Sequence, residues 1–131
     1  MKRVLFLSIA SMAIAGCGGG GGTSPQSSIS GKIIDGYIKG ATVFWDCNAN
    51  GIVDSDEVST SSIEGGNYVI SPSPKTGCRL TAYIPASAID SDTNTSVLAP
   101  YTMYALDSNA AIITPLTTLV VLNSSGSNQR T

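Results

Sequence analysis

Oxygen-bearing side chains recur at alternate positions within one short stretch of the chain. Residues 46–57 read Asp-Cys-Asn-Ala-Asn-Gly-Ile-Val-Asp-Ser-Asp-Glu. This spacing matches the calcium-loop pattern, in which Asp or Asn recurs at alternate positions, Gly follows the third of them, and Glu closes the loop. Calcium takes about 6 to 8 oxygen ligands, and one loop of this length can wrap around the ion to supply them. The sequence therefore predicts a calcium-binding loop.

The expected ligands come from both halves of this loop: the side chains of Asp46, Asn48, Asn50, Asp54 and Glu57 and the main-chain carbonyl of Ile52. Glu57 would close the shell with two oxygens, and Gly51 permits the sharp turn. We expect weak affinity, because the loop has no partner loop to stiffen it. The alternative is an Asx-rich turn without an ion, since Asn, Asp and Gly are ordinary turn residues.

The segments that flank the loop indicate strands. Residues 41–45 are rich in β-formers. Residues 58–63 carry a run of Ser and Thr between the apolar Val58 and Ile63. A loop between strands should not act as a helix-opening sensor. No basic residue lies between Lys39 and Lys75, whereas five acidic residues do. This local acidity suits a cation and argues against nucleic acid as a partner.

The N-terminal residues have the layout of an export signal. Lys2 and Arg3 precede a mostly apolar stretch of 11 residues, 4–14, which is too short to span a bilayer. The run Ile14-Ala15-Gly16-Cys17 resembles the lipobox of bacterial lipoproteins. That resemblance implies a signal peptide over residues 1–16 and lipidation of Cys17. The alternative is an ordinary signal peptide with an incidental cysteine.

Residues 17–28 would then form the lipidated cysteine and a flexible tether. Five glycines and a Ser/Thr/Pro-rich run offer no apolar face, and their r.m.s. reach is about 18 Å. The resemblance implies a lipid anchor in the bacterial cell envelope. Gly18, in place of the Asp that favours inner-membrane retention in this family, points to the outer membrane. Removal of Lys2 and Arg3 leaves 5 basic and 9 acidic residues, a net charge of −4.

The two remaining cysteines, Cys47 and Cys78, form an even pair in an exported chain, which predicts a disulfide bond. The alternative is a reactive thiol, for which the sequence offers only Lys75 or Arg79 as a nearby activator.

Short alternating segments separated by turn residues predict an all-β fold, a small antiparallel β-sandwich of about six to seven strands over residues 29–111. Gly65-Gly66-Asn67 predicts a hairpin turn, and residues 89–96 are expected to form a loop. Residues 112–131 are expected to hold a short helix and a frayed tail. Thr114-Pro115 suits a helix start, and Leu116, Leu119 and Val120 would share one face. The β-branched residues there keep a strand as the alternative.

The stretch from Gly31 to Ile70, with Gly40-Ala41-Thr42-Val43, the Asx-rich loop and Gly66-Asn67-Tyr68, resembles transthyretin-like and carboxypeptidase-regulatory-like domains. It is also similar to the calcium-binding B-repeats of bacterial adhesins. Residues 113–120 resemble a segment that leads into a longer helical region in large surface lipoproteins. The resemblance leaves two alternatives open, a short relative or a truncated gene product.

The composition excludes whole classes of enzyme. The chain has no histidine, which excludes Ser-His-Asp and Cys-His catalysis and imidazole metal sites. We therefore expect a non-catalytic, membrane-anchored and calcium-stabilised surface module for adhesion or spacing. The alternative is a carbohydrate-binding or envelope-maintenance lipoprotein, and its partners would be an extracellular protein or a glycan. Trp45 could serve as a carbohydrate platform, although one aromatic residue at a strand end more often packs.

Lipidation can be tested directly. We expect Cys17→Ala to abolish membrane association and fatty-acid labelling, because the substitution removes the only acceptor in the lipobox-like run. The measurement is metabolic labelling with a fatty acid, followed by membrane fractionation. Equal labelling of the wild-type chain and the variant would contradict the lipobox interpretation.

Overall fold

The computed structural model describes residues 27–72, 76–107 and 111–127. The predicted signal peptide, Cys17 and nearly all of the tether lie outside the described residues. The described part contains ten short strands, one 3-10 turn, η1 (Glu64–Gly66), and one α-helix, α1 (Pro115–Ser127). The strands are β1 (Ile29–Ile33), β2 (Ile38–Lys39), β3 (Thr42–Asp46), β4 (Ser59–Ser61), β5 (Asn67–Ile70), β6 (Arg79–Ile84), β7 (Ile89–Asp90), β8 (Thr95–Ser96), β9 (Tyr101–Tyr104) and β10 (Ile112–Ile113).

The predicted all-β, antiparallel fold is confirmed. A four-stranded sheet has the order β4-β3-β6-β9, and two three-stranded sheets have the orders β10-β1-β5 and β2-β7-β8. All described pairings are antiparallel except β1 with β10. There are more strands than expected because β2, β7, β8 and β10 have two residues each, too few to produce an alternating pattern.

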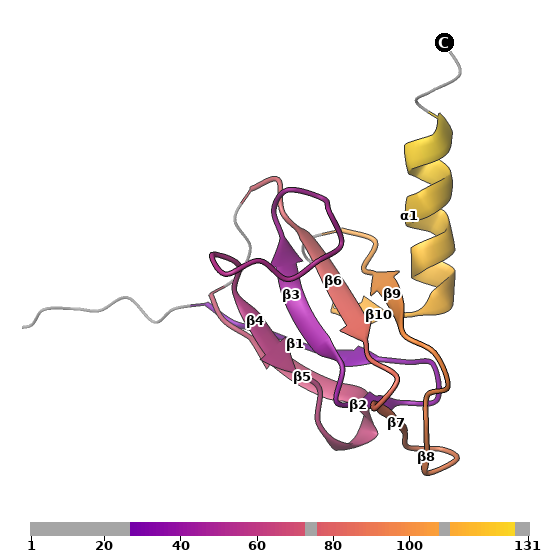
Figure 1. Ribbon diagram of the computed structural model, residues 1–131. Helices are drawn as coiled ribbons and strands as arrows, with labels where there is room; N and C mark the ends of the chain where they lie inside the picture. Colours follow the sequence, from indigo (N-terminus) through magenta and orange to yellow (C-terminus); the bar gives the residue numbers. More distant parts are fainter. Residues whose placement is uncertain (1–26, 73–75, 108–110, 128–131) are drawn as a thin grey trace, which may run out of the picture.

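The core lies between the four-stranded sheet and the β10-β1-β5 sheet. Leu80, Ala82 and Ile84 alternate along β6 and are fully buried, and they share one hydrophobic cluster with Ile33 of β1 and Ile70 of β5. This period of two is what a strand with one face in a core requires. Figure 1 shows β1 and β5 lying across the four-stranded sheet, as in a sandwich.

The predicted hairpin at Gly65-Gly66-Asn67 is wrong. The turn itself is present, with the Ile63 N–H donating to the Asn67 carbonyl at 2.8 Å. However, β4 pairs with β3 and β5 pairs with β1, so the turn carries the chain from one sheet to the other. Gly66 lies so close to the Ile33 carbonyl that a Cβ would clash with it, and its φ is 71°. Tertiary packing against β1 therefore decides the path.

The expected loop over residues 89–96 is also wrong, because it contains the β7–β8 hairpin. The Asp90 carboxylate accepts the N–H groups of Asp92 and Thr93 at 2.8 and 3.3 Å. An Asx turn of this kind closes a short hairpin without any apolar pattern in the sequence.

The expected helix is confirmed as α1, with Thr114 as its N-cap and Pro115 at its first position. The Thr117 N–H donates to the Thr114 hydroxyl at 3.0 Å. The apolar face does not pack, since Leu116 and Leu119 are 71% and 64% exposed. Within the described ranges, no helix has the length and apolar character that a membrane crossing requires.

Helix α1 is attached to the sheet by threonine hydroxyls. Strand β9 forms one edge of its sheet, so the outer backbone groups of Tyr104 have no strand partner. The Tyr104 N–H donates to the Thr118 hydroxyl at 3.0 Å, and the Thr117 hydroxyl donates to the Tyr104 carbonyl at 2.7 Å. Figure 1 shows α1 beside this edge. The helix therefore completes the sheet edge through polar contacts.

We expect Thr118→Val to lower the free energy of unfolding by about 1–2 kcal/mol, because it leaves the Tyr104 N–H without an acceptor while keeping the side-chain size. The control is Leu119→Ala, next in the chain but exposed, which should change stability by less than about 0.5 kcal/mol. Urea unfolding of both variants measures the difference. A larger loss in Leu119→Ala would contradict the polar attachment of the helix.

Candidate functional site

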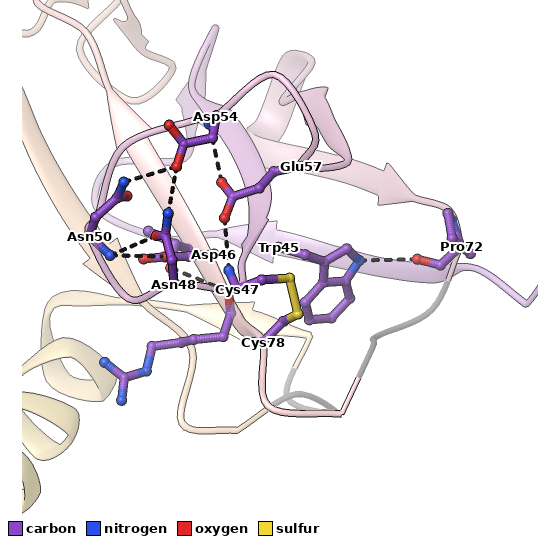
Figure 2. The surroundings of a disulfide bond; sticks show 11 residues. Trp45, Asp46, Cys47, Asn48, Asn50, Asp54, Glu57, Pro72 and Cys78 are labelled. Carbon is purple, nitrogen blue, oxygen red and sulfur yellow. Dashed lines mark hydrogen bonds between the residues drawn. A yellow bond between two sulfur atoms is a disulfide. The ribbon is translucent and has the colours of Figure 1, made fainter.

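The predicted ligands all lie on one crossover between strands. Strand β3 ends at Asp46 and β4 begins at Ser59, and the intervening loop passes across β3 and β6 (Figure 1). Figure 2 shows that the side chains of the predicted ligands gather within this loop: Asp46, Asn48, Asn50, Asp54 and Glu57. The remaining predicted ligand, Ile52, lies at the loop tip with its side chain largely exposed.

Asp46 organises the first half of the loop. Asp46 is only 2% exposed, and its two carboxylate oxygens accept the N–H groups of Asn50 and Gly51 at 3.2 and 2.9 Å. A buried carboxylate needs such partners to offset its loss of water. Gly51 has a φ of 73°, as the predicted sharp turn requires. The first carboxylate of the pattern therefore anchors the turn from inside the fold.

The amides of Asn48 and Asn50 converge on Asp54. Their NH₂ groups donate to the same carboxylate oxygen of Asp54 at 2.7 and 2.9 Å. Their carbonyl oxygens accept the N–H groups of Asn50 and Ile52, respectively, at 3.1 and 2.8 Å. The spacing of the pattern therefore brings three of the predicted ligands together. Asn48 and Asn50 direct their amide nitrogens toward the Asp54 carboxylate.

Glu57 joins the two ends of the loop. One of its oxygens accepts the Cys47 N–H at 2.8 Å, and the other accepts the Asp54 N–H at 3.2 Å. Both carboxylate oxygens thus face the loop backbone (Figure 2). To hold an ion with both oxygens, Glu57 would exchange these two hydrogen bonds for metal contacts.

The donor chemistry of the loop fits a hard cation. Among the residues that the structure describes, no three His, Cys, Asp or Glu side chains lie together as a metal-holding group. Calcium also accepts amide and main-chain oxygens, which the loop supplies through Asn48, Asn50 and Ile52. Rotation of the two amide groups by half a turn would direct their oxygens, in place of their nitrogens, toward Asp54. The residues therefore fit the ion after a local rearrangement of side chains.

The predicted disulfide between Cys47 and Cys78 is confirmed. It connects the first residue of the loop to the residue before β6 (Figure 2). Trp45 lies beside it, 3% exposed, and its indole N–H donates to the Pro72 carbonyl at 3.0 Å. Trp45 therefore packs in the core, and the alternative that it forms a carbohydrate platform is wrong.

Two residues that face the loop from the sheet, Tyr83 and Thr102, were not predicted from the sequence. Tyr83 and Thr102 pair across β6 and β9, and with Gly51, Ile52 and Val53 they line a groove. The alternation of apolar and polar residues over 78–84 is a signal from which the outward position of Tyr83 follows. No pattern in the sequence indicated that the loop would lie over that side.

No protein-family model, curated protein or solved structure matches this chain.

We expect the double variant Cys47→Ala/Cys78→Ala to lose about 3.5–4 kcal/mol of unfolding free energy, because the bond closes a loop of 31 residues in the unfolded chain. Chemical unfolding of the oxidised protein and the variant measures the loss. In parallel, the oxidised protein should show no titratable thiol from these two cysteines in denaturant. Two titratable thiols in protein recovered from an oxidising compartment would contradict the bond.

Proposed function

We propose that this chain is a membrane-anchored, calcium-stabilised, non-catalytic surface module used for adhesion or spacing in the bacterial cell envelope. The observation that carries the proposal is the convergence of Asn48 and Asn50 on the Asp54 carboxylate within a loop of the calcium pattern. The anchor rests on the lipobox-like run that ends at Cys17 and on the tether that follows it.

The electrostatics of the loop support a cation as its occupant. Asp46, Asp54 and Glu57 bring three negative charges into one short segment, and no basic residue occurs between Lys39 and Lys75 in the sequence. Arg79 lies opposite Asp46 across β3 and β6, at the sheet end of the loop. The ion pair between Lys39 and Glu64, at 3.1 Å, lies outside the loop. A bound calcium ion would offset the repulsion among the loop carboxylates. It would hold the loop in one conformation without any change in the sheet.

We expect an affinity of about 10⁻⁵ to 10⁻³ M, the weak end of calcium-binding modules. Two features explain the weakness. The loop has no partner loop, and the ion must displace the hydrogen bonds that Glu57 and the two amides already make. Extracellular settings supply enough calcium for such a site.

A non-catalytic role is supported by the chemistry that the chain lacks and by how its acids are used. The sequence contains no histidine. Asp46 and Glu57 accept backbone N–H groups within the loop, so these carboxylates serve the loop's own shape. The second candidate function, carbohydrate binding, is supported by the groove that the loop forms with the sheet.

Calcium at about 10 mM should raise the thermal unfolding midpoint of the full chain in detergent relative to EDTA. At a hundred times the dissociation constant the gain is about 2.7 kcal/mol, because the ion binds only the folded state. Glu57→Gln should lose most of this calcium-dependent shift, since it removes a charge and one ligand oxygen.

The matched control is Glu64→Gln, which removes the same charge outside the loop and should keep the full shift. The readout is the difference between calcium and EDTA for each protein, so a general loss of stability in Glu57→Gln cancels. If calcium fails to move the wild-type midpoint, or moves Glu57→Gln equally, the loop is an Asx-rich turn and the calcium proposal is wrong.

A further inference from the structure

A row of hydroxyl-bearing side chains crosses the outward face of the four-stranded sheet. Thr42 pairs with Ser61 on one side and with Tyr83 on the other, and Tyr83 pairs with Thr102. Residues directly opposite each other in a sheet share a face, so one row runs across β4, β3, β6 and β9. With neighbouring strands about 4.8 Å apart, the row is roughly 14 Å long.

This row is open, whereas the next one is covered. Tyr83 is 39% exposed, Ser61 is exposed, and Thr42 and Thr102 are half-buried. In the neighbouring row, Phe44 and Thr81 face the same side but are completely buried. The loop between β3 and β4 passes across β3 and β6 (Figure 1). The loop therefore covers the sheet on one side of the row and stands above the level of the row there.

A groove lies where the loop meets the row. The loop residues Gly51, Ile52 and Val53 line one side of it, and Tyr83 and Thr102 line the other. Its volume is about 530 Å³, within the range of about 300–1,000 Å³ that is usual for binding sites of small molecules. None of these lining residues carries a charge. An exposed tyrosine ring, two apolar side chains and a hydroxyl group thus meet at one place.

These groups match the two sides of a sugar. A pyranose ring presents an apolar C–H surface that packs on an aromatic face, and hydroxyls that donate and accept at its rim. Tyrosine offers a large apolar ring with a polar end, and threonine hydroxyls both donate and accept. The neighbouring acids Asp54 and Asp56 and the net charge of −4 after export disfavour an anionic ligand. A peptide that adds to a sheet needs a strand edge, whereas this groove lies on a sheet face.

We propose that this groove binds a neutral oligosaccharide, with the Tyr83 ring as its stacking platform and the hydroxyls of Thr102 and Thr42 as hydrogen-bonding partners along the row. This inference extends the proposed function by naming a ligand class for the surface module. It uses the loop as a wall and requires no contact between calcium and the sugar.

The test screens the full chain, in detergent with calcium present, against an array of neutral and acidic oligosaccharides and against a displayed peptide library. We expect binding to at least one neutral oligosaccharide. Titration calorimetry with that oligosaccharide should show about a tenfold weaker affinity for Tyr83→Ala, since a lost stacking contact is worth about one factor of ten. Tyr83→Phe, which keeps the ring, should retain most of the affinity.

The matched control is Tyr37→Ala. Tyr37 has nearly the same exposure, 37%, but lies in the turn between β1 and β2 and does not line the groove. Its removal should leave the affinity unchanged. If Tyr83→Ala fails to fold, Thr102→Val serves in its place, because valine keeps the branched shape of threonine and removes only the hydroxyl.

Three results would overturn the inference: no neutral oligosaccharide binds, only acidic oligosaccharides or peptides bind, or Tyr83→Ala and Tyr37→Ala have equal effects. The calcium-dependent shift of the unfolding midpoint shows whether the groove inference or the calcium proposal has failed. A calcium shift without oligosaccharide binding removes the groove inference alone. Tyr83-dependent binding without a calcium shift removes the calcium proposal alone.

Discussion

The hydrogen bonds that the buried Asp46 carboxylate accepts are the interaction on which the shape of the β3–β4 loop depends. Asp46 stands at the end of β3, one of the two inner strands of its sheet, and its two carboxylate oxygens accept the N–H groups of Asn50 and Gly51. A carboxylate with so little contact with water is stable only while these donors remain in place. The loop must therefore turn back immediately after the strand. Its direction across the sheet follows from that constraint.

Two further connections fix the loop once Asp46 has turned it. The Cys47–Cys78 bond joins its first residue to the start of β6, and Glu57 accepts N–H groups from Cys47 and Asp54. Both act near the ends of the loop and leave its tip, around Ile52, exposed. The proposed cation among the loop carboxylates and the proposed neutral ligand beside the tip would therefore occupy different parts of the loop.

At the β9 edge of the four-stranded sheet, polar contacts satisfy the backbone groups that have no strand partner. At β9, the hydroxyls of Thr117 and Thr118 satisfy the backbone of Tyr104, and α1 is attached by these bonds. The outward side of α1 carries Leu116 and Leu119 instead. The apolar face predicted from the sequence is therefore opposite to the face that contacts β9. The docked face of α1 buries Val121 and also satisfies the edge groups of Tyr104, whereas the leucines stay on the exposed face.

The sequence by itself determined the strands with clear alternation, the helix start at Thr114-Pro115, the disulfide and the composition of the loop, because each depends on residues close in the chain or on residue type alone. Tertiary structure decided what depends on distant partners. It sent the turn at Gly66 from one sheet to the other because the turn packs beneath the Ile33 carbonyl. It formed β10 against β1, and it placed the loop over the outward face of β6, where Tyr83 meets Ile52 and Val53. Strand pairing and burial set these positions, and neither leaves a local pattern in the chain.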